Sequence, residues 1–378
     1  GGGTGALGGG SGMPGGILAA GGVDPNVGIP DGWSLGDPIL PGAPVFDVDN
    51  QTPEAQAAQF GYNCDYLDIL VTDQAGKKAV LVCSHEYTNE DIMFPPGTPI
   101  GTQARVGIEA HGLSVVELSR TARRKPWSYV PDGALNRRIT GSTPIAVDGP
   151  AAGSDLLKTA ADPTGTLVLG TLNNCSGGTT PWGTILAAEE NIDQYFHCEG
   201  TSPEETRYTL GPQDERQWRT VDPRFDATGP DYRNEPNRFG WIVEIDPHDP
   251  TSTPVKHTAL GRFKHEAATI RITTDGRVAA YSGDDQRFDY VYKFISRDTY
   301  TPGSSDEARE ANKTLLSEGD LYVAVFSGDG MEDGVSDGTG RWIPLVEDGA
   351  SQVPGMSVEE VLVYTRIAAD QVGATKMD

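Results

Sequence analysis

The chain has 378 residues, of which 54 are Asp or Glu and 29 are Lys or Arg, so its net charge is −25. This charge argues against nucleic acid or an anionic membrane surface as the main partner, because both attract positively charged proteins. It suits the binding of cations by clustered carboxylates. No apolar run approaches the roughly 18 residues that cross a bilayer, so no membrane span is expected.

The chain opens with a glycine-rich segment, residues 1–30, that lacks hydrophobic periodicity and predicts an arm ahead of the folded part. Residues 31–378 are expected to form one domain, in which short apolar runs alternate with turn signals. The runs predicted as strands are Tyr66–Val71, Lys78–Cys83, Val115–Ser119, Thr166–Leu172, Gly183–Glu189, Gly240–Ile245, Ala267–Thr273, Arg277–Ser282, Asp289–Ile295, Leu321–Phe326 and Arg341–Leu345. Such a series predicts an all-β fold, either a sandwich, a barrel or a propeller.

Two helices are expected to interrupt the strands. Ser305 can cap a helix over Asp306–Leu316. Ser357 and Glu360 have the spacing of a capping box for a helix over Val358–Gln371, which Gly373 would end.

Carboxylates stand where several apolar strands begin or end. Glu86 follows one strand, Glu189 and Glu190 close another, and Glu266 lies at the start of a third. Alternation along that third strand would put Glu266 on the same face as Ala268 and the isoleucines that follow. A carboxylate on an apolar face is costly unless it is paired or bound to a metal. Any one of these carboxylates could be paired with an arginine at the end of its strand. Several such carboxylates together favour a shared cation site.

The four cysteines are too few for a disulfide scaffold, although their number leaves one or two disulfides open, and no C-x-x-C pair indicates structural zinc. They are Cys64, Cys83, Cys175 and Cys198. Cys175 precedes Gly177, Gly178 and Pro181, which predict a tight loop that could present a thiolate to a metal or a substrate. Thiolate ligands favour a transition metal and carboxylates favour calcium or magnesium. A small buried residue is the alternative role for Cys175.

Two further acidic segments and three histidines complete the candidates. The turn Gly283–Asp289 could bind a cation through Asp284 and Asp285 or be an ordinary Asp-rich turn. The loop Ser327–Gly338 resembles a calcium loop in composition but lacks EF-hand spacing, so we interpret it as a solvated loop. No metal-binding spacing links the histidines, most of which we interpret as structural or as supports for ligand residues; they are His85, His111 and His265.

Three long segments resemble the PhoX family of bacterial alkaline phosphatases. They are Cys175–Asn191, Gly261–Ala267 and Gly283–Lys293, and Ser84–Asn89 and Gly112–Glu117 fit as well. The resemblance extends from about Pro44 to the end of the chain. It implies a six-bladed β-propeller with helical insertions and a central cluster of ferric iron and calcium that acts on phosphate monoesters.

The resemblance also assigns roles to individual residues. Cys175 would be the thiolate ligand of iron, and Glu86, Glu190 and Glu266 would be carboxylate ligands shared between iron and calcium. Asp284 and Asp285 are further ligand candidates. Cys175, Glu190 and Glu266 are the residues expected to carry catalysis.

Family members are longer, and the resemblance implies an Arg and a Glu from a segment expected after Asp378. The propeller is therefore expected to be incomplete in this chain and to need a companion C-terminal part. The family is exported, which implies a periplasmic or secreted protein. Two alternatives stay open: a phosphodiesterase that uses the same metals, and a non-catalytic extracellular propeller stabilised by calcium.

Overall fold

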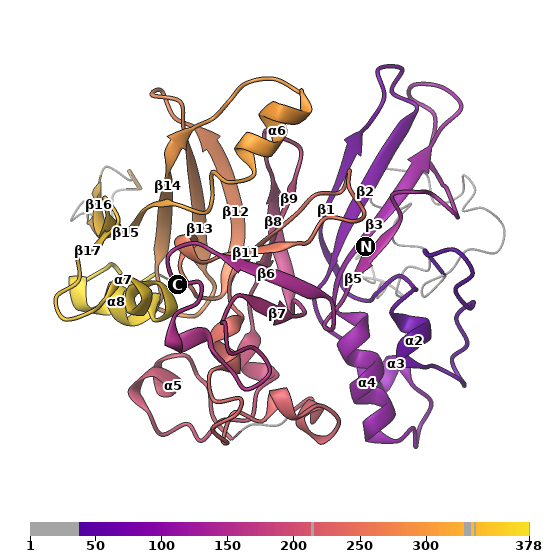
Figure 1. Ribbon diagram of the computed structural model, residues 1–378, viewed down its shortest axis with the longest axis horizontal. Coiled ribbons are helices and arrows are strands. Elements are labelled where there is room, and N and C mark those ends of the chain that lie inside the picture. The colour runs from indigo at the N-terminus through magenta and orange to yellow at the C-terminus, as the bar shows by residue number, and fades with distance from the viewer. Residues whose placement is uncertain (1–37, 213–214, 329–333, 336–337, 378) are drawn as a thin grey trace, which may run out of the picture.

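The structure is a computed structural model that describes residues 38–212, 215–328, 334–335 and 338–377. The predicted glycine-rich arm and the acids of the loop Ser327–Gly338 lie outside the described residues. Within them the fold is mainly β, as expected. Three sheets stand side by side, and none of them closes into a barrel in the part of the chain that the structure describes (Figure 1).

The first sheet has the strand order β1-β2-β3-β4, and β5 also pairs with β3. Its strands are β1 (Cys64–Val71), β2 (Lys78–His85), β3 (Gly112–Ser119), β4 (Ser128–Tyr129) and β5 (Arg137–Ile139). The strands predicted over Tyr66–Val71 and Lys78–Cys83 form β1 and β2, which pair as an antiparallel hairpin.

The second sheet has the order β7-β6-β11-β10-β9-β8, in which only β6 and β11 run parallel. Its strands are β6 (Pro144–Asp148), β7 (Leu167–Leu169), β8 (Asn174–Thr179), β9 (Ile185–Glu189), β10 (Ile242–Ile245) and β11 (Val255–His257). The sequence did not predict β6, β8 and β11, because each is short and carries polar residues or glycine.

The third sheet is an antiparallel meander from β12 to β17 in chain order. Its strands are β12 (His265–Ile272), β13 (Arg277–Asp284), β14 (Val291–Thr299), β15 (Gly319–Ser327), β16 (Thr339–Glu347) and β17 (Ala350–Ser351). All but the last were predicted, because their apolar runs are long and their turns are rich in Asp and Gly.

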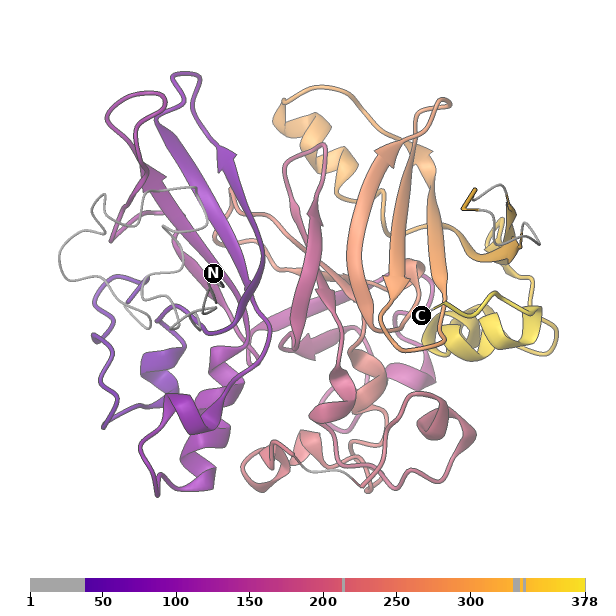
Figure 2. The same cartoon turned by 180° about the vertical axis from the view of Figure 1, so that it is seen from behind.

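Short helices cover the ends and the outer side of the sheets. They are α2 (Pro53–Gln56), α3 (Glu90–Met93), α4 (Ile100–Ala110), α5 (Pro203–Arg207), α6 (Asp306–Asn312), α7 (Val358–Val363) and α8 (Thr365–Val372). The helices α2 to α5 gather at one end of the sheets and α6 lies at the other (Figures 1 and 2).

The helix predictions were right in their caps and wrong in their extents. Ser305 caps α6, and Ser357 forms the predicted capping box with Glu360 at the start of α7. The helix expected as far as Gln371 breaks at Tyr364, whose ψ of 46° separates α7 from α8.

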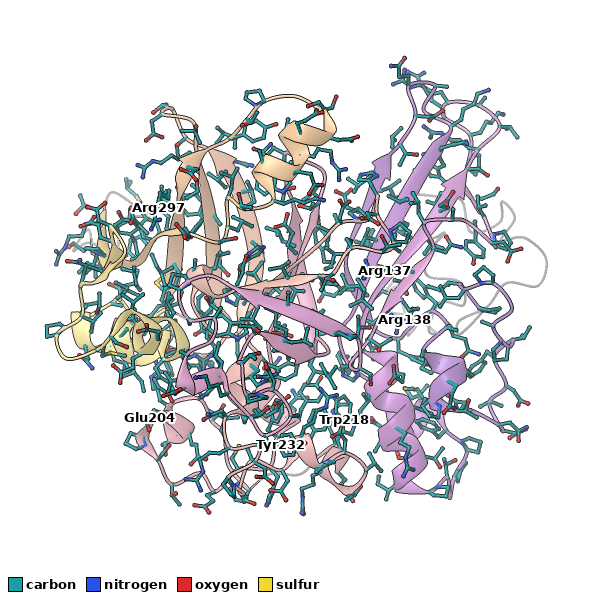
Figure 3. The ribbon with its side chains drawn as sticks, in the orientation of Figure 1. Arg137, Arg138, Glu204, Trp218, Tyr232 and Arg297 are labelled. Carbon is teal, nitrogen blue, oxygen red and sulfur yellow. The ribbon has the colours of Figure 1, made fainter. Side chains whose placement is uncertain are left out.

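Helix α4 was not predicted from the sequence. Pro99 stands at its N-cap without a side-chain hydrogen bond, and two glycines lie within it, so its local signal is weak. Tertiary packing stabilises it instead. Val106 and Ile108 are buried, and the short helical turn that carries Trp218, labelled in Figure 3, contacts α4.

Two cores fill the spaces between the sheets. Val80 and Val82 of β2 pack with Ile185 and Val243 of the second sheet, and a larger apolar cluster joins the second sheet to the third. The inner strands β1, β8 and β12 therefore come into contact along the middle of the molecule. No helix among the described residues combines the length and the apolar character needed to cross a membrane.

Candidate metal centre

Each sheet contributes an inner hairpin of the same design. In each hairpin, the first residue of the inner strand pairs with the last residue of the strand that returns. The residue that follows the returning strand donates its N–H to the carbonyl oxygen of the residue that precedes the inner strand. The three ladder pairs are Cys64–His85, Asn174–Glu189 and His265–Asp284. The three hydrogen bonds run from Glu86 to Asn63 (3.0 Å), from Glu190 to Asn173 (3.1 Å) and from Asp285 to Lys264 (3.0 Å). Three acids thus hold the same place in three hairpins.

The inner strands also share an irregularity near their first residues. The ladder is interrupted after Cys64 in β1, after Asn174 in β8 and after Glu266 in β12. A bulge at such a point changes the direction of the side chains beside it. The second residue of each inner strand can ligate a metal, and these residues are Asp65, Cys175 and Glu266.

Cys175, Glu190 and Glu266 form the heart of the site. One potential ligand atom from each lies within 4.8 Å of the other two, as the sequence analysis required of a shared cation site. The Cys175 Sγ is 3.5 Å from Glu266 Oε2 and 3.3 Å from the carbonyl oxygen of His265. Cys175 and Glu190 are buried, whereas Glu266 is exposed, so the cluster has an open side.

Burial and the charges of neighbouring carboxylates, among them Glu86, Asp65 and Asp285, raise the pKa values of the cluster. Burial, followed by the charges of Asp65, Glu266 and Asp285, raises the pKa of Glu86 to about 7. Burial and then a hydrogen bond with Asp285 raise the pKa of Glu190 to about 8. Burial and the nearby carboxylates also raise the pKa of the Cys175 thiol. Ionising all of these groups together is unfavourable unless a cation is present.

The prediction that Glu266 lies on the same face as Ala268 and Ile270 was wrong. Ala267 has a φ of 74°, and the ladder shifts between Glu266 and Thr269. Glu266 is therefore exposed, like Thr269, whereas Ala268 and Ile270 are buried on the opposite face of the strand. A non-glycine residue with positive φ is costly and is often found at functional sites.

The prediction of a tight loop at Cys175 was also wrong. Cys175 lies within strand β8, where Gly177 and Gly178 pair with Ala187 and Leu186. The turn comes later, between Thr180 and Thr184. The glycines serve close packing, because a Cβ on Gly178 would lie 2.1 Å from the carbonyl oxygen of Ala268 in β12. Cys175 is thus held by a sheet, not by a loop.

The two candidate aspartates of the Gly283–Asp289 turn separate. Arg366 of α8 binds the Asp284 carboxylate with two hydrogen bonds of 2.6 Å, and both side chains are buried. Asp285 is exposed and lies beside Glu190 and Glu86. The structure therefore brings Asp285 to the cluster and gives Asp284 an arginine partner.

The remaining candidates have structural partners. Glu189 is buried and binds Lys256 Nζ at 2.7 Å. His111 contacts the Gly107 carbonyl and the Tyr195 hydroxyl, and His265 contacts Ser282 and the Gly261 carbonyl. These contacts agree with the structural role expected for both histidines.

Asp65 is the cluster residue that sequence reasoning missed. It belongs to no acidic run and follows Cys64, which drew attention to the cysteine alone. A repeated sequence pattern could have revealed it. Asn63-Cys64-Asp65 precedes the strand that ends before Glu86, and Asn173-Asn174-Cys175 precedes the strand that ends before Glu190. Both asparagines adopt positive φ, at 45° and 48°. Aligning the two segments would have given Asp65 the position of Cys175.

The donor set fits metal ions. Five carboxylates and one thiol converge, and within the described ranges no lysine or arginine forms an ion pair with any of those carboxylates, whereas the neighbouring Asp284 has one. Carboxylate oxygens suit hard cations such as calcium, and a thiolate suits a transition metal. The residues to hold metal are Asp65, Glu86, Cys175, Glu190, Glu266 and Asp285.

A cavity of about 630 Å³ opens beside the centre. Glu86 and Asn173 line it on the side of the cluster, and Arg216 supplies a cation to its wall. The Arg216 guanidinium is held by the Thr88 carbonyl and hydroxyl at 2.9 and 2.8 Å and by Glu90 at 3.2 Å. The cavity therefore adjoins the centre at Glu86.

Together, the inner hairpins and their donor cluster define a mainly β protein with a composite carboxylate–thiol centre of the kind that holds metal ions. The chain belongs to the PhoX alkaline phosphatase family, whose sequence profile matches residues 24–378. This confirms the resemblance found in the sequence and implies metal cofactors.

A solved structure supports the same assignment. The chain is similar to Pseudomonas fluorescens PhoX in complex with vanadate, a transition-state analogue, with 41% sequence identity and a TM-score of 0.82. The match covers 91% of this chain and 60% of the Pseudomonas chain, so this chain spans less than two thirds of that protein. No curated protein matches the chain.

Proposed function

We propose that this protein is a metal-dependent phosphatase that hydrolyses phosphate monoesters, with ferric iron and calcium as cofactors. The observation that carries the proposal is the convergence of Cys175, Glu190 and Glu266 within 4.8 Å in a relative of a PhoX that binds a transition-state analogue. Such analogues bind where an enzyme stabilises its transition state.

The donor atoms divide between the two metals by their chemistry. The Cys175 thiolate, with Glu190 and Glu266, suits iron, whereas the oxygens of Glu86, Asp65 and Asp285 suit calcium. When bound, such ions bind phosphate oxygens and lower the pKa of a bound water.

The side chains of this chain then have two tasks. Glu86 and Glu190 have pKa values of about 7 and 8 without metal, so their carboxylates must release protons when the ligands assemble near neutral pH. Arg216 and Asn173, on the cavity wall, can orient the substrate beside the centre. Without cations, the carboxylates would repel a phosphate dianion.

The test compares chromogenic phosphate monoesters and diesters with the purified full chain and its metal content. Monoester turnover that a calcium chelator abolishes, with both iron and calcium bound, supports the proposal. Faster diester turnover would assign the same centre to phosphodiesters. Bound calcium without iron and without turnover would identify a non-catalytic propeller.

We also propose that the three sheets belong to a six-bladed propeller that acts in the periplasm or outside the cell. The adjacent inner strands β1, β8 and β12 support this architecture. Fractionation of the source cells tests the location. Counting the blades by electron microscopy of the assembled protein tests the architecture, and a ring with another number of blades would contradict it.

A further inference from the structure

Two thiols and an imidazole gather on the first sheet, apart from the carboxylate centre. Potential ligand atoms of Cys64, Cys83 and His85 all lie within 4.8 Å of one another. Cys64 pairs with His85 across the β1–β2 ladder, and Cys83 lies two residues before His85. Because side chains alternate along a strand, all three project from the same face of the hairpin.

The His85 ring has one nitrogen in use and one without a partner. Its Nε2 is 2.6 Å from the Ser114 hydroxyl, to which it can donate when Nδ1 binds a metal, and 3.3 Å from the Gly61 nitrogen. Its Nδ1 has no hydrogen-bond partner among the described residues, although the side chain is fully buried. The Tyr62 backbone interacts with the ring but is not in hydrogen-bonding geometry with Nδ1. A buried nitrogen of this kind needs an explanation, and a metal ion would provide one.

Both cysteines are free thiols in the structure. Cys83 pairs with Leu67, not with Cys64, so the two cysteines are diagonal neighbours at the point where the ladder is interrupted. Tetrahedral zinc, with bonds of about 2.3 Å to sulfur and 2.0 Å to nitrogen, needs donors roughly 3.5–3.8 Å apart. Small side-chain rotations from separations of at most 4.8 Å would suffice.

We propose that Cys64, Cys83 and His85 form a second metal site, for a thiophilic divalent cation such as zinc. Cys83 and His85 are buried, whereas Cys64 is exposed and leaves a route and a fourth coordination position for the ion. The buried guanidinium of Arg138 lies 3.5 Å from the Ser114 hydroxyl, which in turn lies 2.6 Å from His85 Nε2.

The place of this site in the hairpin suggests its role. Asp65 follows Cys64, and Glu86 follows His85, so both acids leave the hairpin next to the proposed ligands. An ion there would join β1 to β2 at the end from which these acids reach the carboxylate centre. The site would thus position two residues of that centre.

The test uses cobalt(II), which substitutes for zinc and shows a thiolate charge-transfer absorption. Cys175→Ser serves as the background, because it removes the thiolate of the carboxylate centre. Anaerobic titration of this full-length variant with cobalt(II) should give the thiolate band, saturating at one equivalent. Zinc should then displace the cobalt and bleach the band.

Three further variants in the same background decide the assignment. Cys83→Ser and Cys64→Ser should each weaken cobalt binding by at least about 10-fold, and Cys198→Ser, which alters a buried cysteine elsewhere, should leave it unchanged. Absence of the band with free thiols present would overturn the proposal. So would a Cys64–Cys83 disulfide found by mass spectrometry of the untreated protein, or a band that survives both substitutions.

Discussion

At the scale of single residues, the centre is defined by which acids lack a cationic partner. Asp284 and Asp285 are adjacent, yet Arg366 binds the first and the second lies beside Glu190. Glu189 and Glu190 divide in the same way, because Lys256 binds Glu189. In each pair the structural acid is the last residue of a strand and the candidate ligand is the next residue.

Cys175→Ser should remove the iron ligand while leaving the sheet intact, because serine fits the space of cysteine in β8. We expect phosphatase activity to fall by at least about 100-fold, with loss of bound iron. Element analysis and monoester kinetics measure both effects. Cys198→Ser is the matched control, since Cys198 is equally buried but lies outside the cluster. Full iron content in Cys175→Ser would contradict the ligand assignment.

The metal-free protein should lose stability as the pH rises from about 4.5 to about 8. Burial raises the folded-state pKa of Glu86 to about 7 and, together with a hydrogen bond that protonated Glu190 donates to Asp285, that of Glu190 to about 8. Over this range the folded state binds more protons than the unfolded state, so the free energy of unfolding decreases with pH.

Urea denaturation of chelator-treated protein between pH 4.5 and 8.5 measures this dependence. Glu190→Gln should make it shallower, because glutamine does not titrate, and added metal should reverse it, because metal favours the ionised carboxylates. A metal-free protein whose stability rises across this range would show that the carboxylates do not repel one another.

At the scale of secondary-structure elements, one hairpin design is used three times and each copy is anchored differently. The third copy depends on α8, because Arg366 holds the end of β13 through Asp284 and also lies 3.5 Å from Asp289. This contact fixes the strand just before Asp285. A helix near the C-terminus thereby positions a residue of the candidate centre.

Arg366→Met should destabilise the fold by roughly 3–5 kcal/mol, because it leaves the buried Asp284 without its partner. The double variant Arg366→Met with Asp284→Leu should recover much of that loss, since no buried charge then lacks a partner. Chemical denaturation of both variants and of the wild type completes the comparison. Equal stability of the wild type and the single variant would show that the pair does not hold α8 to β13.

At the scale of the whole molecule, a buried network joins the second sheet to the segment before β15. His257 of β11 lies 2.9 Å from Asp148 Oδ1 and 2.8 Å from Glu244 Oε2. The Ser317 hydroxyl donates to the other oxygen of Asp148. Burial alone would lower the pKa of His257, but the two carboxylates outweigh it and raise the pKa to about 10.

His257→Gln should therefore cost stability in a pH-dependent way. Because the folded-state pKa is raised from 6.5 to about 10, the protonated histidine contributes fully below pH 6.5, and the contribution disappears as the pH rises through 10. The variant should be less stable by roughly 2 kcal/mol at pH 6, and the difference should shrink toward pH 10. Thermal unfolding across this range measures it, and a constant difference would mean that His257 is neutral.

The sequence by itself determined the β-rich fold, most of the third sheet, the helix caps and the family. These features depend on local patterns: apolar runs bounded by Asp and Gly turns, Ser at helix starts, and long segments such as Gly283–Lys293. It also indicated Glu86, Cys175, Glu190 and Glu266 as candidate ligands, because strand ends meet at sheet edges.

Only the tertiary structure decided which acids gather and which are paired. Arg366 is 82 residues from Asp284 in the sequence, and Lys256 is 67 residues from Glu189. No local sequence pattern therefore predicts either ion pair. Asp65 joins the cluster because the first sheet packs beside the second, and α4 forms because tertiary contacts outweigh its weak propensity. Local structure depends on residues that are close in the sequence. The centre depends on contacts between distant segments, and these contacts form only when the three sheets pack together.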